Sequence, residues 1–121
     1  MPLVNISILK GKSPEYKKAI SDSINSAVIE TMAFPDDDRY QIINEVESDC
    51  LQYQNRNSDR VMMFLIMRAG RSNKVKKDFY KKAVENLSAN PGILPENIFI
   101  TVAENQDIDW SFSDGIAQFV V

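Results

Sequence analysis

The residue of this chain with the clearest chemical potential is Pro2, which directly follows the initiator Met1. We expect Met1 to be removed, because a small second residue such as proline favours trimming. The mature chain would then begin with a secondary amine at the start of an apolar, strand-like run. A free α-amine has a pKa of about 7.7–8.0, which burial or cations lower and anions raise. Such an amine can act as a general base, a general acid or a nucleophile.

The absence of histidine narrows the other candidates. Without histidine, the chain cannot use Ser–His or Cys–His catalysis, nor a metal site based on imidazole. An enzyme with this sequence would draw its acid–base groups from carboxylates, lysine, tyrosine or the terminal amine. A proline at position 2, taken alone, is more often only a tolerated residue at a frayed terminus, so the rest of the chain must decide.

Composition indicates one globular domain, 1–121, of ordinary character. The chain has 121 residues, of which 44% are hydrophobic and 26% charged. A net charge of −3 argues against nucleic acid or an anionic membrane as partner. No apolar run approaches the ~20 residues of a membrane span, and no signal-peptide pattern is present. The single Cys50 cannot form an internal disulfide, so we expect a cytoplasmic protein.

Periodicity predicts the elements that must position any site. Residues 3–9 alternate as a strand, and Ser13 can cap a helix that should end near Ala33, before Pro35. Further strands are predicted over 40–46, 61–67 and 98–103, and a second helix follows Ser72 as far as Asn90. The strand 61–67 is apolar throughout, as in a central strand covered on both faces. The polar segment 47–60 is predicted to be a loop, for which a lid over a pocket is one role.

The two halves of the chain repeat. Gly11-Lys12-Ser13 in the first half matches Gly70-Arg71-Ser72 in the second, and Pro35 and Pro95 each precede a strand. Each half (about 2–46 and about 61–103) is therefore a βαβ unit with parallel strands, followed by an aromatic tail over 104–121. We predict an α/β (α+β) fold: a four-stranded sheet with both helices on one face. The opposite apolar face predicts a homo-oligomer.

The chain resembles the tautomerase superfamily, whose members share an N-terminal catalytic proline, and within it malonate semialdehyde decarboxylase and its relatives. The resemblance spans nearly the whole chain and is carried by an ordered set of residues: Pro2, the segment Pro35-Asp36-Asp37-Asp38-Arg39-Tyr40-Gln41, Gly70-Arg71-Ser72, Phe79-Tyr80, Glu104-Asn105 and Asp109-Trp110-Ser111-Phe112. It implies a homotrimeric fold of βαβ repeats with no metal and no organic cofactor.

The resemblance also implies roles for individual residues. Pro2 matches the catalytic amine, Asp38 an aspartate that activates water or orients the reacting group, and Arg71 an arginine that binds the substrate carboxylate. Arg71 precedes a helix start, where a guanidinium and unpaired backbone N–H groups can converge on an anion. The pocket walls are matched by three aromatic residues, Trp110, Phe112 and Phe119.

One position departs from the decarboxylase pattern. The decarboxylase has a second arginine two residues before the one matched by Arg71, and this chain has Ala69 there. Arg68 is adjacent, but a shift of one residue in a strand reverses the face. Decarboxylation of malonate semialdehyde and keto–enol tautomerisation of a small 2-oxo or 3-oxo acid therefore both remain open. A non-catalytic, ferredoxin-like module that binds a small ligand or partner is the alternative from another class.

Overall fold

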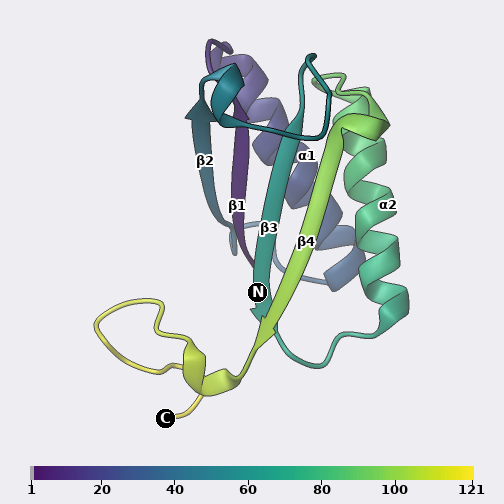
Figure 1. Ribbon diagram of the computed structural model, residues 1–121. Helices are drawn as coiled ribbons and strands as arrows, with labels where there is room; N and C mark the ends of the chain where they lie inside the picture. The colour runs from purple at the N-terminus through teal and green to yellow at the C-terminus, as the bar shows by residue number, and fades with distance from the viewer. Residues whose placement is uncertain (1) are drawn as a thin grey trace.

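The computed structural model describes residues 2–121 and contains four strands and two long helices (Figure 1). Short 3-10 turns at Ser48–Cys50, Pro95–Asn97 and Asp107–Asp109 complete it. The elements follow in the order β1 (Pro2–Leu9), α1 (Pro14–Met32), β2 (Tyr40–Val46), β3 (Val61–Arg68), α2 (Asn73–Ala89) and β4 (Ile98–Asn105).

The sheet has the strand order β2-β1-β3-β4. β1 pairs with β2 in parallel and β3 with β4 in parallel, whereas the two central strands β1 and β3 are antiparallel. Two βαβ units are therefore present, as predicted. A ferredoxin-like domain splits its βαβ unit with an intervening strand. Here β1 and β2 are direct neighbours, so the ferredoxin-like alternative has the wrong topology.

The two helices begin in the same way. The Oγ atoms of Ser13 and Ser72 accept hydrogen bonds from the backbone N–H of Tyr16 at 3.1 Å and of Val75 at 3.2 Å. These N-caps satisfy donors that would otherwise lack partners in the first helical turn. At the other end of α1, Ala33 adopts a left-handed φ of 59° and its N–H bonds to Ile29 O at 3.1 Å. The helix thus ends where the sequence predicts.

Both helices cover the same face of the sheet, and the core lies between these two layers (Figure 1). Every second residue of β1 and β3 faces the helices and is buried, as the period of a strand requires. Burying each such large apolar side chain contributes about 1.5–3 kcal/mol. The core is formed mainly by Val4, Ile6, Ile8, Ile20, Ile24, Val61, Met63, Leu65, Met67, Phe79 and Leu87.

The other face of the sheet is open in a single chain. Phe64, in the middle of β3, remains 48% exposed, so β3 is central but covered on one face only. Ile42 on β2 and Phe99 on β4 are also exposed on this side. The tail after β4 extends past the end of the sheet and does not cover its open face (Figure 1). No helix within 2–121 is long and apolar enough to cross a membrane.

The 47–60 segment is a packed loop at the end of the sheet opposite Pro2. Its organiser is Arg60, which is 4% exposed and donates to the carbonyl oxygens of Leu51, Ser58 and Ser48 at 3.0, 2.9 and 2.8 Å. Because β2 ends beside the last residue of β1, the loop emerges far from Pro2. A lid over Pro2 of the same chain is therefore wrong; the polar composition concealed a buried arginine that holds the loop down.

Candidate functional site

Pro2 begins β1 and lies opposite Met67, at the end of the sheet where β3 and β4 finish. Its side chain is buried and belongs to the same face of the strand as Val4, so it points to the helix layer. The predicted removal of Met1 falls outside the described residues. An amine placed here would sit at the rim of the core, where the surroundings govern its pKa.

Arg71 lies at the same end of the sheet, in the turn from β3 to α2. Gly70 permits this turn with a φ of 116°. The Arg71 guanidinium is half-buried, donates from Nη1 to Arg68 O at 3.1 Å, and packs 4.9 Å from the centre of the Phe34 ring. Among residues 2–121 it has no carboxylate within ion-pair distance. It is therefore a cation that can still accept an anionic partner.

The surroundings of Arg71 also act on its charge. Burial and the nearby Arg68 charge lower the pKa of Arg71 from its usual high range, and Glu104 opposes the shift. Glu104 Oε2 accepts the Gly70 N–H at 3.0 Å, and its Oε1 pairs with Lys76. These hydrogen bonds, the one from Lys76 first, lower the pKa of Glu104. Glu104 therefore stays ionised and holds the turn that presents Arg71, a role that sequence reasoning missed.

Asp38 reaches the same end through β2. Tyr40 pairs with Leu3, so the residues just before Tyr40 lie next to the start of β1. Asp38 is half-buried, and its N–H donates to Pro35 O at 3.1 Å in a turn. Burial, followed by the charge of Asp38 and a hydrogen bond with it, raises the pKa of Tyr40. Asp38 is thus close to Tyr40, at the Pro2 end of the sheet.

The aromatic residues of the tail form one cluster. The rings of Trp110 and Phe112 stack at 5.4 Å, and Phe119 meets Phe112 edge-on at 5.3 Å. Tyr40 joins the cluster, with its ring 5.5 Å from that of Phe112. The buried Nε1 of Trp110 has no hydrogen-bond partner within 2–121. The structure therefore brings all three predicted wall residues together and attaches them to the start of β2.

Arg68 connects this cluster to β3. Its Nε donates to Asp107 Oδ1 at 2.9 Å, and its guanidinium lies 3.9 Å from the centre of the Phe119 ring. Met67, the residue before it, faces the helix layer and is buried. Arg68 consequently belongs to the opposite face of β3, where the tail engages it. Position 69 holds alanine, and Arg68 is paired with Asp107. Arg71 is therefore the arginine of this turn that has no carboxylate partner among the residues described.

The predicted residues thus converge from four segments on one end of the sheet. A hollow of about 680 Å³ lies elsewhere, against the 47–60 loop, and its lining includes Asp49, Arg56 and Arg60. The guanidinium of Arg60 is already bonded to backbone carbonyls there, whereas Arg71 at the Pro2 end has no carboxylate partner within 2–121. No group of three or more cysteine or acidic side chains within 2–121 is placed to hold a metal ion.

Comparison with known proteins identifies the family of the chain. Two family models, each described as "Tautomerase enzyme", match residues 38–113 and residues 2–55. The probable tautomerase YrdN of Bacillus subtilis (strain 168) is 30% identical over 127 residues, covering 99% of this chain and 97% of that protein. The probable tautomerase YusQ of the same organism is 29% identical over 126 residues, covering 99% of each.

Solved structures extend the similarity to three dimensions. FG41 malonate semialdehyde decarboxylase, inhibited by 3-bromopropiolate, superposes with a TM-score of 0.91 at 30% identity, covering 98% of this chain and 94% of that chain. A second malonate semialdehyde decarboxylase gives 0.91 at 28% identity, with coverages of 98% and 95%. Native fused 4-OT shares the fold with a TM-score of 0.84 at 11% identity, covering 98% of each chain. The chain therefore belongs to the tautomerase family of enzymes, in the branch that resembles malonate semialdehyde decarboxylase.

Proposed function

We propose that this enzyme acts without a cofactor on a small 2-oxo or 3-oxo carboxylic acid, using the amine of Pro2 after removal of Met1. The observation that carries the proposal is Arg71, a half-buried cation without a carboxylate partner in the described chain, at the same sheet end as Pro2. A guanidinium binds a carboxylate through two parallel hydrogen bonds, which orients the substrate as well as holding it. The substrate's reacting carbon and carbonyl then face the amine.

The first candidate reaction is keto–enol tautomerisation. The neutral Pro2 nitrogen takes the proton of the enol hydroxyl, and the resulting ammonium returns it to the adjacent carbon as the carbonyl forms. This step needs an amine that is unprotonated at neutral pH. Burial at the start of β1 and the cation Arg71 at the same end of the sheet favour that form, because each makes a protonated amine less stable.

Decarboxylation is the second candidate, supported by the close superposition on two malonate semialdehyde decarboxylases. Here a protonated Pro2 donates a hydrogen bond to the carbonyl oxygen while Arg71 holds the carboxylate. The bond between the carboxylate and the α-carbon breaks, CO₂ leaves, and its electron pair forms an enolate that is then protonated. Asp38 would favour this route, since a nearby anion raises the pKa of the amine. Ala69 weakens it, because the pattern of the decarboxylase has a second arginine there.

The experiment that separates the two is an NMR time course of malonate semialdehyde with the purified enzyme in D₂O. Acetaldehyde, formed faster than without enzyme, would establish decarboxylation with Arg71 as the single arginine of the turn. Enzyme-dependent deuterium exchange at the carbon between the two carbonyl groups, without loss of CO₂, would establish proton transfer. If neither occurs with this substrate or with a panel of 2-oxo acids, the proposal fails.

Two further measurements test the role of Pro2 directly. Intact mass should show that active protein lacks Met1, and retention of Met1 in fully active enzyme would contradict the mechanism. FG41 malonate semialdehyde decarboxylase is inhibited by 3-bromopropiolate. We expect this compound to inactivate the present enzyme too, with an adduct that peptide mass mapping locates on Pro2. A Pro2→Ala variant should resist the modification.

We also propose that the open face of the sheet is buried between copies of the chain. Ile42 and Phe64 are 49% and 48% exposed there, which is unusual for large apolar residues of a central sheet. Fused 4-OT, which shares the fold, forms trimers. We therefore expect a homotrimer by sedimentation equilibrium. Phe64→Lys should dissociate it, whereas Lys77→Ala, on the exposed side of α2, should leave it intact; a monomeric wild-type protein would overturn the proposal.

A further inference from the structure

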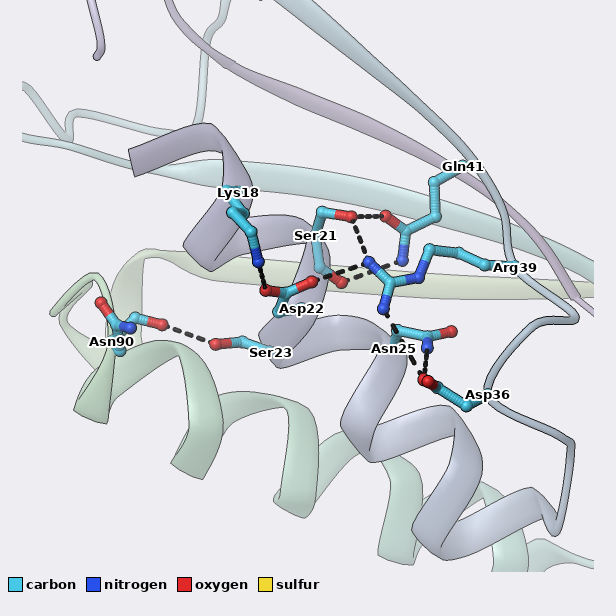
Figure 2. Close-up of polar contacts among 9 residues, drawn as sticks. All are labelled: Lys18, Ser21, Asp22, Ser23, Asn25, Asp36, Arg39, Gln41 and Asn90. Atoms are coloured by element: carbon cyan, nitrogen blue, oxygen red, sulfur yellow. Dashed lines mark hydrogen bonds and ion pairs between the residues drawn. The ribbon is translucent and has the colours of Figure 1, made fainter. Parts of the chain in front are cut away.

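The segment that carries Asp38 is tied to α1 by polar side chains around Arg39 (Figure 2). Arg39 Nη1 donates to Asp22 Oδ1 at 2.8 Å and to Ser21 Oγ at 3.0 Å. Ser21 Oγ in turn donates to Gln41 Oε1 at 2.6 Å, and Gln41 Nε2 returns a hydrogen bond to Ser21 O at 3.1 Å. The first residues of β2 are thus bound to one turn of α1.

Asn25 is a further residue of α1 that contacts this segment. This residue is 4% exposed, and in the orientation drawn in Figure 2 its Nδ2 contacts Asp36 Oδ1 at 3.4 Å. With the amide reversed, its oxygen accepts from Arg39 Nη2 at 3.1 Å and from Nε at 3.2 Å. The reversed orientation is favoured, because the drawn one sets amide N–H groups against guanidinium N–H groups. Arg39 then engages three residues of α1 and also lies 3.9 Å from Asp36.

The surface of α1 that receives Arg39 is held in place on its other side. Ser23 Oγ donates to Asn90 O at 2.6 Å, just after α2 (Figure 2), and Asn86 Nδ2 donates to Ser23 O at 3.0 Å. Hydrogen bonds from Lys18 and Arg39 lower the pKa of Asp22. Asp22 therefore stays ionised at neutral pH and keeps a charge-assisted hydrogen bond to Arg39, which is stronger than a neutral one.

Asp38 lies between Asp36 and Arg39, which form an ion pair. Asp36 precedes it, 3.9 Å from the Arg39 guanidinium, Arg39 follows it, and its own N–H closes the turn to Pro35 O at 3.1 Å. We infer that Arg39 is a positioning residue, which fixes Asp38 against the Pro2 end of the sheet by clamping the 36–41 segment to α1. The inference rests on the proposed function, since it matters for catalysis only if Asp38 takes part in the reaction.

The contacts of Arg39 also offset the electrostatic repulsion within the segment that carries Asp38. Asp38 projects from a turn that three consecutive aspartates fill with negative charge. Mutual repulsion would favour an open conformation of this turn, and Arg39 opposes it by supplying a cation at its end. A misplacement of a catalytic group by about 1 Å can lower a rate by roughly 100-fold. Attachment to the rigid helix α1 through Arg39 therefore limits the movement of Asp38.

The test compares Arg39→Ala with a matched control, Arg56→Ala, at the far end of the sheet. Arg56 Nε donates to Glu96 O at 2.7 Å, so the control also removes an arginine that is hydrogen-bonded to another segment of the chain. Hydrogen–deuterium exchange should rise in the peptide covering 34–41 for Arg39→Ala and stay unchanged there for the control. We expect kcat to fall by roughly 10- to 100-fold in Arg39→Ala, with KM within about twofold of wild type. Unchanged exchange in 34–41 would overturn the clamp.

Two more variants distinguish a positioning role of Arg39 from a general structural role. Arg39→Lys keeps the charge opposite Asp22 but lacks the fork that reaches Ser21 and Asn25, so we expect only partial rescue of kcat. In an Asp38→Asn background, Arg39→Ala should cause no further loss of kcat, because the group it positions is already disabled. An equal loss in both backgrounds would overturn the positioning role. Wild-type kcat in Asp38→Asn would instead refute the role of Asp38, while the exchange result would still decide the clamp.

Discussion

The two ends of the sheet are equivalent in topology and different in chemistry. β1 and β3 are the first strands of the two repeats, and they pair in antiparallel fashion. At each end of the sheet, the start of one of these strands therefore lies beside the turn that follows the other. Three pairs of positions correspond by the repeat: Pro2 and Val61, Asp38 and Asn97, and Arg71 and Lys12. The fold therefore builds one framework twice.

The groups at the far end are paired with one another. Lys12 Nζ lies 2.5 Å from Asp59 Oδ1 and 5.2 Å from the centre of the Tyr16 ring. Asn97 is 3% exposed and donates to Ser58 Oγ at 2.9 Å. Arg71, by contrast, has no carboxylate partner in the described chain. The topology therefore provides two possible sites, and the side chains leave a cation without a carboxylate partner at the Pro2 end of the described chain.

The largest expected effect comes from replacing the secondary amine of Pro2. Pro2→Ala, which leaves a primary amine outside the proline ring, should lower kcat/KM by about 100- to 10,000-fold, the range of an impaired acid–base group, while the protein stays folded. The matched change, Val61→Ala, should lower the free energy of unfolding by about 1–3 kcal/mol, because Val61 is fully buried, with little effect on rate. Steady-state kinetics and urea unfolding measure both. Equal rate losses in the two variants would erase the proposed difference between the ends.

The next comparison removes the cation at each end. Arg71→Gln should raise KM for an oxo acid by about 10- to 100-fold, the value of charge-assisted hydrogen bonds worth roughly 1.5–3 kcal/mol. Lys12→Gln should leave KM within about twofold, since Lys12 is already paired with Asp59. Initial rates over a range of substrate concentrations measure KM. A larger effect from Lys12 would place substrate binding at the far end.

A smaller difference is expected for Glu104 and Glu45, which occupy corresponding positions of the two repeats. Glu104 pairs with Lys76 and also accepts the Gly70 N–H, whereas Glu45 lies 3.4 Å from Lys17 in a simple surface pair. Glu104→Gln should raise KM about two- to fivefold by loosening the turn of Arg71, and Glu45→Gln should not.

The pH dependence of KM provides the check on this comparison. The pKa of Glu104 is lowered in the fold, so its contribution is present above the ordinary carboxylate pKa and is lost as pH falls through the lowered value. In acid, the KM of the wild type should therefore approach that of Glu104→Gln. A constant ratio of the two KM values down to the acid limit of folding would contradict this role.

The smallest effect concerns a tyrosine at the far end. Burial, with the nearby Asp59, raises the pKa of Tyr16 from 10.0 to about 12. Its neutral form is therefore favoured by folding: this stability is present below pH 10 and is lost as pH rises through about 12. Absorbance titration should show this late phenolate, and Tyr16→Phe should remove it. Asp59→Asn should lower the pKa of Tyr16 but leave unchanged that of Tyr40, at the Pro2 end; an equal response of both would refute the local cause.

The helices and strands could be predicted from the sequence because their causes are local. Alternating apolar residues define β1, and the serine before each helix accepts an N–H at its start, as Ser13 and Ser72 do. β2 spans the predicted 40–46, whereas β4 extends two residues past the predicted end at Ala103. The repeat then led to the two βαβ units. The site residues came from a resemblance, and their catalytic roles stay predictions.

Other features could not be foreseen from residue type. Arg39, Arg60 and Arg68 look alike in the sequence, yet the first binds α1, the second organises a loop from within, and the third contacts the tail. An arginine side chain is long and has several donors, so its partners depend on which segments happen to lie within reach. The polar composition of 47–60 likewise concealed a loop that packs around a buried guanidinium.

The elements, their repeat and the apolar stripe that each helix turns to the sheet can be read from the sequence, because they follow from backbone periodicity and neighbouring side chains. The antiparallel pairing of β1 and β3 is visible only in the folded chain. That pairing sets Pro2 beside Met67, only four residues before Arg71, although the proline and the arginine are far apart in the chain. Such contacts depend on the closure of long connecting segments and on which faces pack together, and no local sequence pattern encodes either.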